Sequence, residues 1–182
     1  MKRTILATFF SVFCLCVVCL PIIVLATGII LNNTPTQVFF SSYGGCTDAI
    51  VNQINNAKSE VLIQAYSFTS KEIALAIVGA RKRGLQVEII LDRTNRSAKY
   101  SAADYTAHIG ITSYIDSMHP IAHNKIIIID GETVITGSFN FTRAAEKSNA
   151  ENLLIIKNRD LAKVFLDNWM KHKEHSQGYE GK

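Results

Sequence analysis

The chain has 182 residues, of which 48% are hydrophobic and 19% are charged, and its formal net charge at pH 7 is +4. Removing Lys2 and Arg3 from the 19 basic residues leaves 17 against 15 acidic residues. This balance excludes a strongly basic protein that holds nucleic acid by charge alone, while the length and apolar content are sufficient for one domain with a buried core.

The N-terminal segment begins with Lys2 and Arg3 and continues with residues 5–31, which are almost wholly apolar. A basic start before an apolar stretch predicts a secretory signal peptide over residues 1–28. As a helix the apolar stretch would extend about 40 Å, enough to span a bilayer, so an uncleaved membrane anchor is the alternative. We therefore expect a periplasmic or secreted protein or, as the alternative, one anchored to the inner membrane and facing the periplasm.

Strand and helix signals alternate along the rest of the chain. Ser70 is a typical helix cap and Gly84 a typical helix end, while Thr47 or Asp48 would cap the first helix. The alternation indicates an α/β fold of one domain. We expect a linker at 29–37, strands at 38–40, 60–66, 86–91, 111–115, 123–129, 132–136 and 151–156, helices at 47–57, 70–83, 97–108 and 159–173, a domain spanning 38–175, and a flexible tail at 176–182.

The most informative stretch follows the pattern H-x-K-x-x-x-x-D, formed by His123, Lys125 and Asp130. Asp130 and Gly131 lie between two apolar runs and predict a hairpin turn. If a strand runs through residues 123–129, His123 and Lys125 point to the same face, and Asp130 has the opposite parity. We therefore expect His123 and Lys125 to act on a ligand and Asp130 to have a structural role.

A second part of the pattern, G-S-x-N, begins seven residues after Asp130 and contains Gly137, Ser138 and Asn140. A phosphodiester is negatively charged, so its cleavage needs positive charge, hydrogen-bond donors, a nucleophile and an acid for the leaving oxygen. Lys125 offers the charge, and Ser138 and Asn140 offer neutral donors to the phosphate. Gly137 is assigned to the structural part of the pattern.

His123 can attack phosphorus through one ring nitrogen when the imidazole is neutral. The other nitrogen then needs a partner, most simply a carboxylate, and Glu151 at the start of a predicted strand is the best candidate. One histidine cannot be nucleophile and protonated acid in the same step. Because the chain has one copy of the pattern and no internal repeat, the second copy should come from a second chain, in a two-fold homodimer.

A metal site is the alternative reading of the histidines. His119 and His123 are four residues apart, but Pro120 between them opposes the helix that would align them. The sequence has no H-E-x-x-H pattern and no cysteine pair with zinc spacing, and an ammonium at Lys125 would repel a divalent cation. We therefore expect no metal ligands and no cofactor in this site.

With its H-x-K-x-x-x-x-D and G-S-x-N parts, the sequence resembles the phospholipase D superfamily, and most closely the Nuc-type bacterial endonucleases with one signature per chain. The resemblance extends from about Val38 to His172. It implies a mixed sheet flanked by helices on both faces, and a homodimer with the active site at its interface. It further implies a covalent phosphohistidine on His123 of one subunit, protonation of the leaving oxygen by His123 of the other, phosphate binding by Lys125 and Asn140, and orientation of His123 by Glu151.

The leading hypothesis is thus a metal-independent endonuclease without sequence preference, with DNA, or alternatively RNA, as substrate. A phospholipase D or cardiolipin-type lipid phosphodiesterase is the second hypothesis, because the same chemistry cleaves lipid phosphodiesters and the apolar N-terminus could attach the protein to a membrane. A non-enzymatic DNA-binding protein that recognises phosphate is the third.

Overall fold

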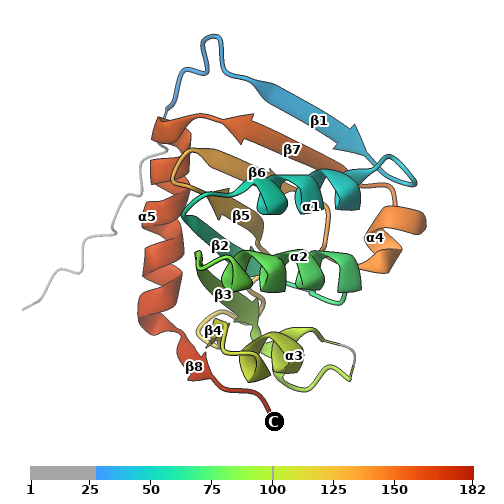
Figure 1. The fold of residues 1–182 in the computed structure, drawn as a ribbon, viewed down its shortest axis with the longest axis vertical. Coiled ribbons are helices and arrows are strands. Elements are labelled where there is room, and N and C mark those ends of the chain that lie inside the picture. The colour runs from blue at the N-terminus through green and yellow to red at the C-terminus, as the bar shows by residue number, and fades with distance from the viewer. Residues whose placement is uncertain (1–27, 100) are drawn as a thin grey trace, which may run out of the picture.

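The computed structural model describes residues 28–99 and 101–182. They form a mixed eight-stranded sheet with helices on both faces (Figure 1), which confirms the expected fold class. The strands are β1 (Thr36–Phe40), β2 (Glu60–Ala65), β3 (Gln86–Asp92), β4 (Thr112–Asp116), β5 (Lys125–Ile129), β6 (Thr133–Gly137), β7 (Asn152–Lys157) and β8 (Gln177–Tyr179). The helices are α1 (Cys46–Asn56), α2 (Lys71–Lys82), α3 (Ala103–His108), α4 (Arg143–Lys147), α5 (Arg159–His175) and the short 3-10 helix η1 (Arg93–Arg96).

The strand order is β1-β7-β6-β5-β2-β3-β4-β8. The β2–β3 and β3–β4 pairs are parallel, and the other neighbours are antiparallel. The carboxyl ends of β2, β3 and β4 and the start of β5 therefore meet at one edge of the sheet.

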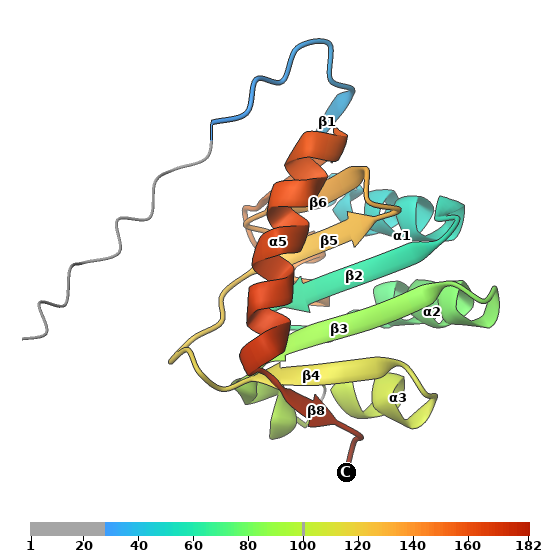
Figure 2. The same ribbon diagram turned by 90° about the vertical axis from the view of Figure 1, so that its left-hand side faces the viewer.

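The two faces of the sheet are covered by different helices. The helices α1, α2 and α3 lie on one face, and α5 crosses the other (Figure 2). In β5, Ile127 and Ile129 pack into the core on the α1 and α2 side, while Ile126 and Ile128 pack against α5. The run of isoleucines is thus buried on both faces, as its composition predicts. Trp169 of α5 is also buried, and its indole nitrogen donates to the carbonyl oxygen of Ile63 in β2 at 3.0 Å.

Helix α2 begins as expected, because the Ser70 hydroxyl accepts a hydrogen bond from the amide of Ile73. The expected cap of the first helix by Thr47 or Asp48 is wrong. Gly45 occupies the cap position without a side-chain bond, and the carboxylate of Glu146 accepts from the amides of Gly45 and Thr47 at 3.1 and 2.7 Å. A carboxylate from α4 therefore supplies the cap.

The hairpin at Asp130 and Gly131 is confirmed, with φ angles of 53° and 61° that suit a type I′ turn. The Asp130 carboxylate accepts hydrogen bonds from the amides of Lys58, Ser59 and Glu60 at 2.9, 2.7 and 3.1 Å. These contacts fasten the turn to the start of β2.

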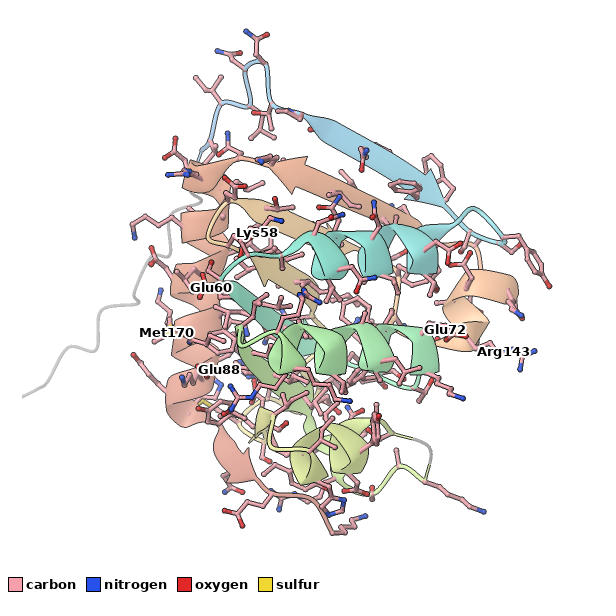
Figure 3. All side chains as sticks on the ribbon, viewed as in Figure 1. Lys58, Glu60, Glu72, Glu88, Arg143 and Met170 are labelled. Atoms are coloured by element: carbon pink, nitrogen blue, oxygen red, sulfur yellow. The ribbon has the colours of Figure 1, made fainter. Side chains whose placement is uncertain are left out.

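In Figure 3, Lys58 and Glu60 lie together on one side of the view, and Glu72 and Arg143 lie together on the opposite side.

Several predicted boundaries are corrected. The linker predicted at 29–37 overlaps β1, which begins at Thr36 because Thr36 pairs with Ile156 of the antiparallel strand β7. The helix predicted at 97–108 is shorter in the structure, where α3 begins at Ala103. The amide of Ala103 donates a hydrogen bond to the hydroxyl of Ser101, just before the helix.

The tail predicted to be flexible, 176–182, contains β8. Tyr179 pairs with Ser113 in β4, and its hydroxyl forms a hydrogen bond with the carboxylate of Asp104. The unpaired edge of β4 gives this segment backbone partners that its own sequence does not reveal.

The expected signal peptide or anchor lies outside the described residues, except for Gly28. Within 28–99 and 101–182, no helix combines the length and the apolar character needed to cross a membrane.

Candidate active site

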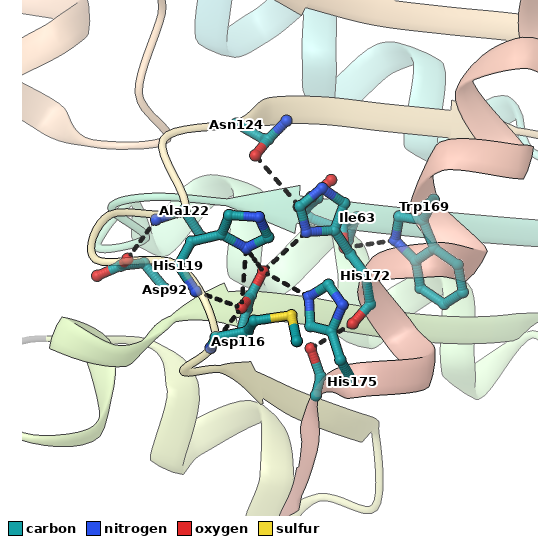
Figure 4. A network of polar contacts seen from close by, with 12 residues as sticks. Ile63, Asp92, Asp116, His119, Ala122, Asn124, Trp169, His172 and His175 are labelled. Atoms are coloured by element: carbon teal, nitrogen blue, oxygen red, sulfur yellow. Dashed lines mark hydrogen bonds and ion pairs between the residues drawn. The ribbon is translucent and has the colours of Figure 1, made fainter. Parts of the chain in front are cut away.

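All residues of the signature except Asp130 lie at the sheet edge where β2, β3 and β4 end and β5 begins. The strand expected over 123–129 starts at Lys125, so His123 precedes it in a loop. Two of its hydrogen bonds hold the part of the loop on either side of His123. The amide of Ala122 donates to the buried carboxylate of Asp92 at 2.7 Å (Figure 4), and the amide of Tyr66 donates to the carbonyl oxygen of Asn124 at 2.9 Å.

His123 and Lys125 meet at the ring of Tyr66. The exposed imidazole of His123 has its centroid 4.4 Å from that of Tyr66, and Nζ of Lys125 lies 5.1 Å from the Tyr66 centroid. Tyr66 follows β2 directly and was not among the predicted site residues. Its position at the carboxyl end of a buried strand was the signal that could have identified it.

Lys125 is buried, and its ammonium donates to the carbonyl oxygen of His123 at 2.6 Å. Burial lowers the pKa of Lys125 below its ordinary value, and the charge of Glu151 nearby raises this pKa in part. An ammonium has three donors, and hydrogen bonding to the protein within the described residues uses one of them. Lys125 therefore has donors to offer to an anion at this edge.

Asn140 lies between two aromatic anchors. Phe139 and Phe141 are both buried, and the carbonyl oxygen of Phe141 accepts from the amides of Thr69 and Ser70, each at 2.9 Å. The side-chain Oδ1 of Asn140 is buried and has no hydrogen-bond partner in the described part of the chain. Such an acceptor calls for a donor, whereas the Nδ2 group of the same amide carries the two N–H donors that an anion would accept from.

Gly137 allows the close approach of β6 and β7. Its φ is 148°, and a Cβ at this position would lie 2.3 Å from the carbonyl oxygen of Asn152. That distance is impossible for a side-chain carbon, so the backbone contact requires glycine here.

Ser138 and Glu151 form a pair. The Ser138 hydroxyl donates to Oε2 of Glu151 at 2.6 Å and accepts from the amide of Asn152 at 3.0 Å. The other carboxylate oxygen of Glu151 accepts from the Asn149 side chain at 2.8 Å. The expected contact between Glu151 and His123 is not formed in this chain, so the orienting role of Glu151 and the phosphate-binding role of Ser138 stay predictions.

The fold therefore brings most of the signature together and separates one member. The Tyr66 ring contacts both His123 and Lys125. Burial lowers the pKa of Lys125 and the charge of Glu151 raises it in part, and Glu151 accepts a hydrogen bond from Ser138. Asp130 lies at the opposite end of β5, with the start of β2. This arrangement matches an imidazole nucleophile beside an anion-binding ammonium, which is the chemistry of a phosphodiesterase.

Comparison with known proteins agrees with this geometry. Residues 50–172 match the family described as cardiolipin synthase, PLD-like domain. A phospholipase D from Rickettsia felis is 46% identical over 143 residues, covering 79% of this chain and 72% of that protein.

Two solved structures share the fold. The phospholipase D family member Nuc from Salmonella typhimurium superposes with a TM-score of 0.78 and 40% identity, over 81% of this chain and 99% of Nuc. NucT from Helicobacter pylori superposes with a TM-score of 0.74 and 25% identity, over 80% of this chain and 99% of NucT. The chain belongs to the phospholipase D superfamily and is a phosphodiesterase of the single-domain, Nuc-like kind.

Proposed function

We propose that the protein is a metal-independent endonuclease without sequence preference, which hydrolyses DNA phosphodiester bonds as a homodimer. The observation that carries the proposal is the single signature, with an exposed His123 at the sheet edge beside Lys125. The similarity to Nuc, which extends over 99% of that chain, supports a Nuc-like activity over one that requires additional domains.

In the proposed first step, a ring nitrogen of His123 attacks phosphorus and forms a P–N bond while the P–O bond to the leaving group breaks. The leaving oxygen takes a proton from His123 of the second subunit. That imidazole then removes a proton from water, which attacks phosphorus and breaks the P–N bond. Lys125 and Asn140 hold the phosphate oxygens and stabilise the charge that develops on them.

The positions of the other histidines support the proposed second subunit. His119, His172 and His175 all contact Asp116 on the α5 side of the sheet, and His108 ends α3. Each of them thus has another place in the fold, which supports a second copy of His123 as the acid. The exposed position of His123 permits two copies to face each other across a two-fold axis.

Nicking of supercoiled plasmid by the purified full chain in EDTA tests the proposal. Wild-type protein should nick and His123→Ala should not, whereas His108→Ala, which changes a histidine outside the site, should retain activity. Mass spectrometry should find a phosphorylated His123 after rapid quenching. A requirement for added metal, or full activity in His123→Ala, would refute this function.

A lipid phosphodiesterase is the second candidate, because the Rickettsia relatives carry the name phospholipase D. Met118 and Ile121 of the loop before His123 are 69% and 60% exposed, and such side chains can enter a membrane surface. Parallel assays on plasmid and on cardiolipin vesicles separate the candidates. For a lipid enzyme, Ile121→Ser should reduce lipid turnover, and plasmid nicking should be absent in all variants.

We also propose that the protein acts outside the cytoplasm, either released into the periplasm or held to the inner membrane. Lys2, Arg3 and the apolar residues 5–31 support this placement. Fractionation of cells that produce the full chain tests it. Recovery in the cytoplasmic fraction would contradict it, and recovery in the membrane fraction would favour the uncleaved anchor.

A further inference from the structure

A cluster on the α5 side of the sheet edge joins three of the five histidines of the chain to one carboxylate (Figure 4). Asp116 ends β4, His119 lies in the loop that follows it, and His172 and His175 lie in the last turn of α5. One donor atom from each of the four residues lies within 4.8 Å of every other. Among residues 28–99 and 101–182, no other group of three or more metal-ligating side chains converges in this way.

The geometry is directed at a single point. Nδ1 of His172, Nδ1 of His119 and Nε2 of His175 lie 2.7, 3.1 and 3.2 Å from the same oxygen, Oδ2 of Asp116. The three imidazole centroids are 5.0–5.3 Å apart. In a tetrahedral zinc site, neighbouring ligand atoms are separated by about 3.3 Å, so small movements of these side chains would admit an ion between them.

The carboxylate of Asp116 is held in a fixed orientation that suits a metal ligand. Asp116 is fully buried, and its second oxygen, Oδ1, accepts from the amides of Met118 and His119 at 3.1 and 3.4 Å. These bonds fix the plane of the carboxylate and aim Oδ2 at the histidines, as outer hydrogen bonds do in metal sites. The side chains of His119, His175 and His172 are 44%, 22% and 14% exposed, so an ion can enter from solvent.

The electrostatics favour a cation. The cluster contains one carboxylate and lies at the carboxyl end of α5, where the helix dipole is negative. The ammonium of Lys173, in the same turn of α5, is paired with Glu88 at 2.6 Å. Three protonated imidazoles around one carboxylate would repel one another, whereas a single divalent ion satisfies all four ligands with the imidazoles neutral.

We propose that Asp116, His119, His172 and His175 bind one Zn²⁺ ion in a structural site. Three imidazole nitrogens and one carboxylate oxygen form a ligand set that zinc accepts in tetrahedral geometry. The ion fastens the end of α5 to the loop of residues 117–124, which carries His123. This site is separate from the reaction centre, because Lys125 shares its strand parity with Ile127 and Ile129, on the opposite side of the sheet from α5.

The cluster differs from the pair of His119 and His123 considered in the sequence, because the donor atoms that converge are those of Asp116, His119, His172 and His175. His119 instead joins residues of α5 that are more than fifty positions further along the chain, such as His172, whose contact with Asp116 spans 56 positions.

The experiment uses the full chain, produced without a polyhistidine tag. Metal content is measured by mass spectrometry after purification, and metal-free protein is then titrated with zinc chloride. We expect about one zinc per chain and a dissociation constant below about 1 µM. At zinc concentrations about 100-fold above that constant, the melting temperature should rise by about 5–10 °C.

Variants locate the ion. His119→Ala, at the most exposed ligand, should weaken zinc binding by about 100-fold or more and abolish the rise in melting temperature, whereas the matched control His108→Ala should bind zinc as wild type does. Circular dichroism verifies that each variant is folded, and His175→Ala replaces His119→Ala if the latter is not. Less than about 0.1 zinc per wild-type chain with no thermal shift would overturn the proposal, and so would unchanged zinc binding in the folded ligand variant.

Cobalt gives a readout that does not depend on any variant. Co²⁺ in a tetrahedral nitrogen and oxygen site has strong visible absorption bands, and octahedral Co²⁺ in solution has weak ones. Strong bands that zinc displaces in a one-to-one ratio would support the site. Their absence at saturating cobalt would overturn its tetrahedral structural character.

Discussion

At the scale of single residues, the site depends on a tyrosine that contacts two signature residues at once. The Tyr66 ring packs against the His123 ring in a tilted arrangement and lies under the ammonium of Lys125. A cation near an aromatic face is stabilised by about 1–2 kcal/mol when partly desolvated. Tyr66 therefore acts as a positioning residue, because it fixes the imidazole and favours the charged form of a lysine whose burial favours the neutral one.

We predict that Tyr66→Ala lowers kcat on a chromogenic phosphodiester by about tenfold, because the imidazole and the ammonium lose their shared support. Tyr66→Phe keeps the ring and should remain within about threefold of wild type. Steady-state rates, measured with variants whose melting temperatures have been verified, test this. Wild-type kcat in Tyr66→Ala would show that the ring has no part in positioning.

Asp130 is a second single residue with a defined role, which is to stabilise the fold. Burial raises the pKa of its carboxyl, but the amides of Ser59, Glu60 and Lys58 outweigh burial and hold the pKa below its ordinary value. A carboxyl with a folded-state pKa below the unfolded one contributes stability above the unfolded pKa of about 4, and this contribution is lost as the pH falls through the folded-state pKa.

We predict that Asp130→Asn destabilises the protein by about 2 kcal/mol at pH 7, and that the difference from wild type shrinks below about pH 4. Urea unfolding at several pH values measures both. Asp167→Asn changes an exposed carboxylate and should cost less than about 0.5 kcal/mol. A difference for Asp130→Asn that persists undiminished in strong acid would contradict the assignment.

At the scale of elements, the junction of β6 and β7 positions the second half of the signature. The backbone of Gly137 approaches Asn152 so closely that no side chain fits. The amide of Ser138, one residue further, donates to the carbonyl oxygen of Asn152 at 3.2 Å and to its side chain at 2.8 Å. The position of Asn140 thus depends on a backbone contact that starts at a glycine.

We predict that Gly137→Ala destabilises the fold by about 2–4 kcal/mol and abolishes most activity, because β6 must move away from β7. Gly79→Ala is the matched control. Its Cβ would meet only the Arg83 side chain, at 3.8 Å, and the change in a helix interior should be neutral or stabilising by up to about 1 kcal/mol. Thermal melts of the two variants compare the positions directly.

The elements also show where sequence reasoning succeeds and where it fails. The four isoleucines at 126–129 predicted a strand buried on both faces, because only apolar residues of both parities suit a strand between two helix layers. Ser70 predicted the start of α2 because its cap is local. The start of α1 could not be predicted, because its cap is Glu146, a contact that spans 99 positions in the case of Thr47.

The residues of the candidate site also include some that a local pattern predicts and one that it does not. The signature fixed His123, Lys125 and Asn140 as candidates from spacing alone. Tyr66 was missed, because its role depends on β2 and β5 being neighbours, a pairing that no local pattern encodes.

At the scale of the whole molecule, the proposed reaction makes the dimer the functional unit. If one phosphate is handled by both copies of His123, a dimer with one mutated copy is inactive. A site contained in one chain would leave half of such a dimer working.

We predict that co-refolding wild type with an equal amount of His123→Ala leaves about a quarter of the initial plasmid-nicking activity per total protein, because only dimers with two wild-type subunits are active. Independent subunits would leave about half. Nicking rates across a series of mixing ratios distinguish a quadratic from a linear dependence on the wild-type fraction, and size-exclusion chromatography with light scattering verifies the dimer. A linear dependence would rule out a shared centre.

Trp169 is the single tryptophan of the chain, and it is buried between α5 and β2, with its indole nitrogen bonded to Ile63. The tryptophan fluorescence of the protein therefore comes from one residue in one environment. Emission at short wavelength indicates that α5 is docked on the sheet, and a shift to longer wavelength indicates that water has reached this interface. The protein thus contains an optical reporter, needing no label, for the docking of α5 on its face of the sheet.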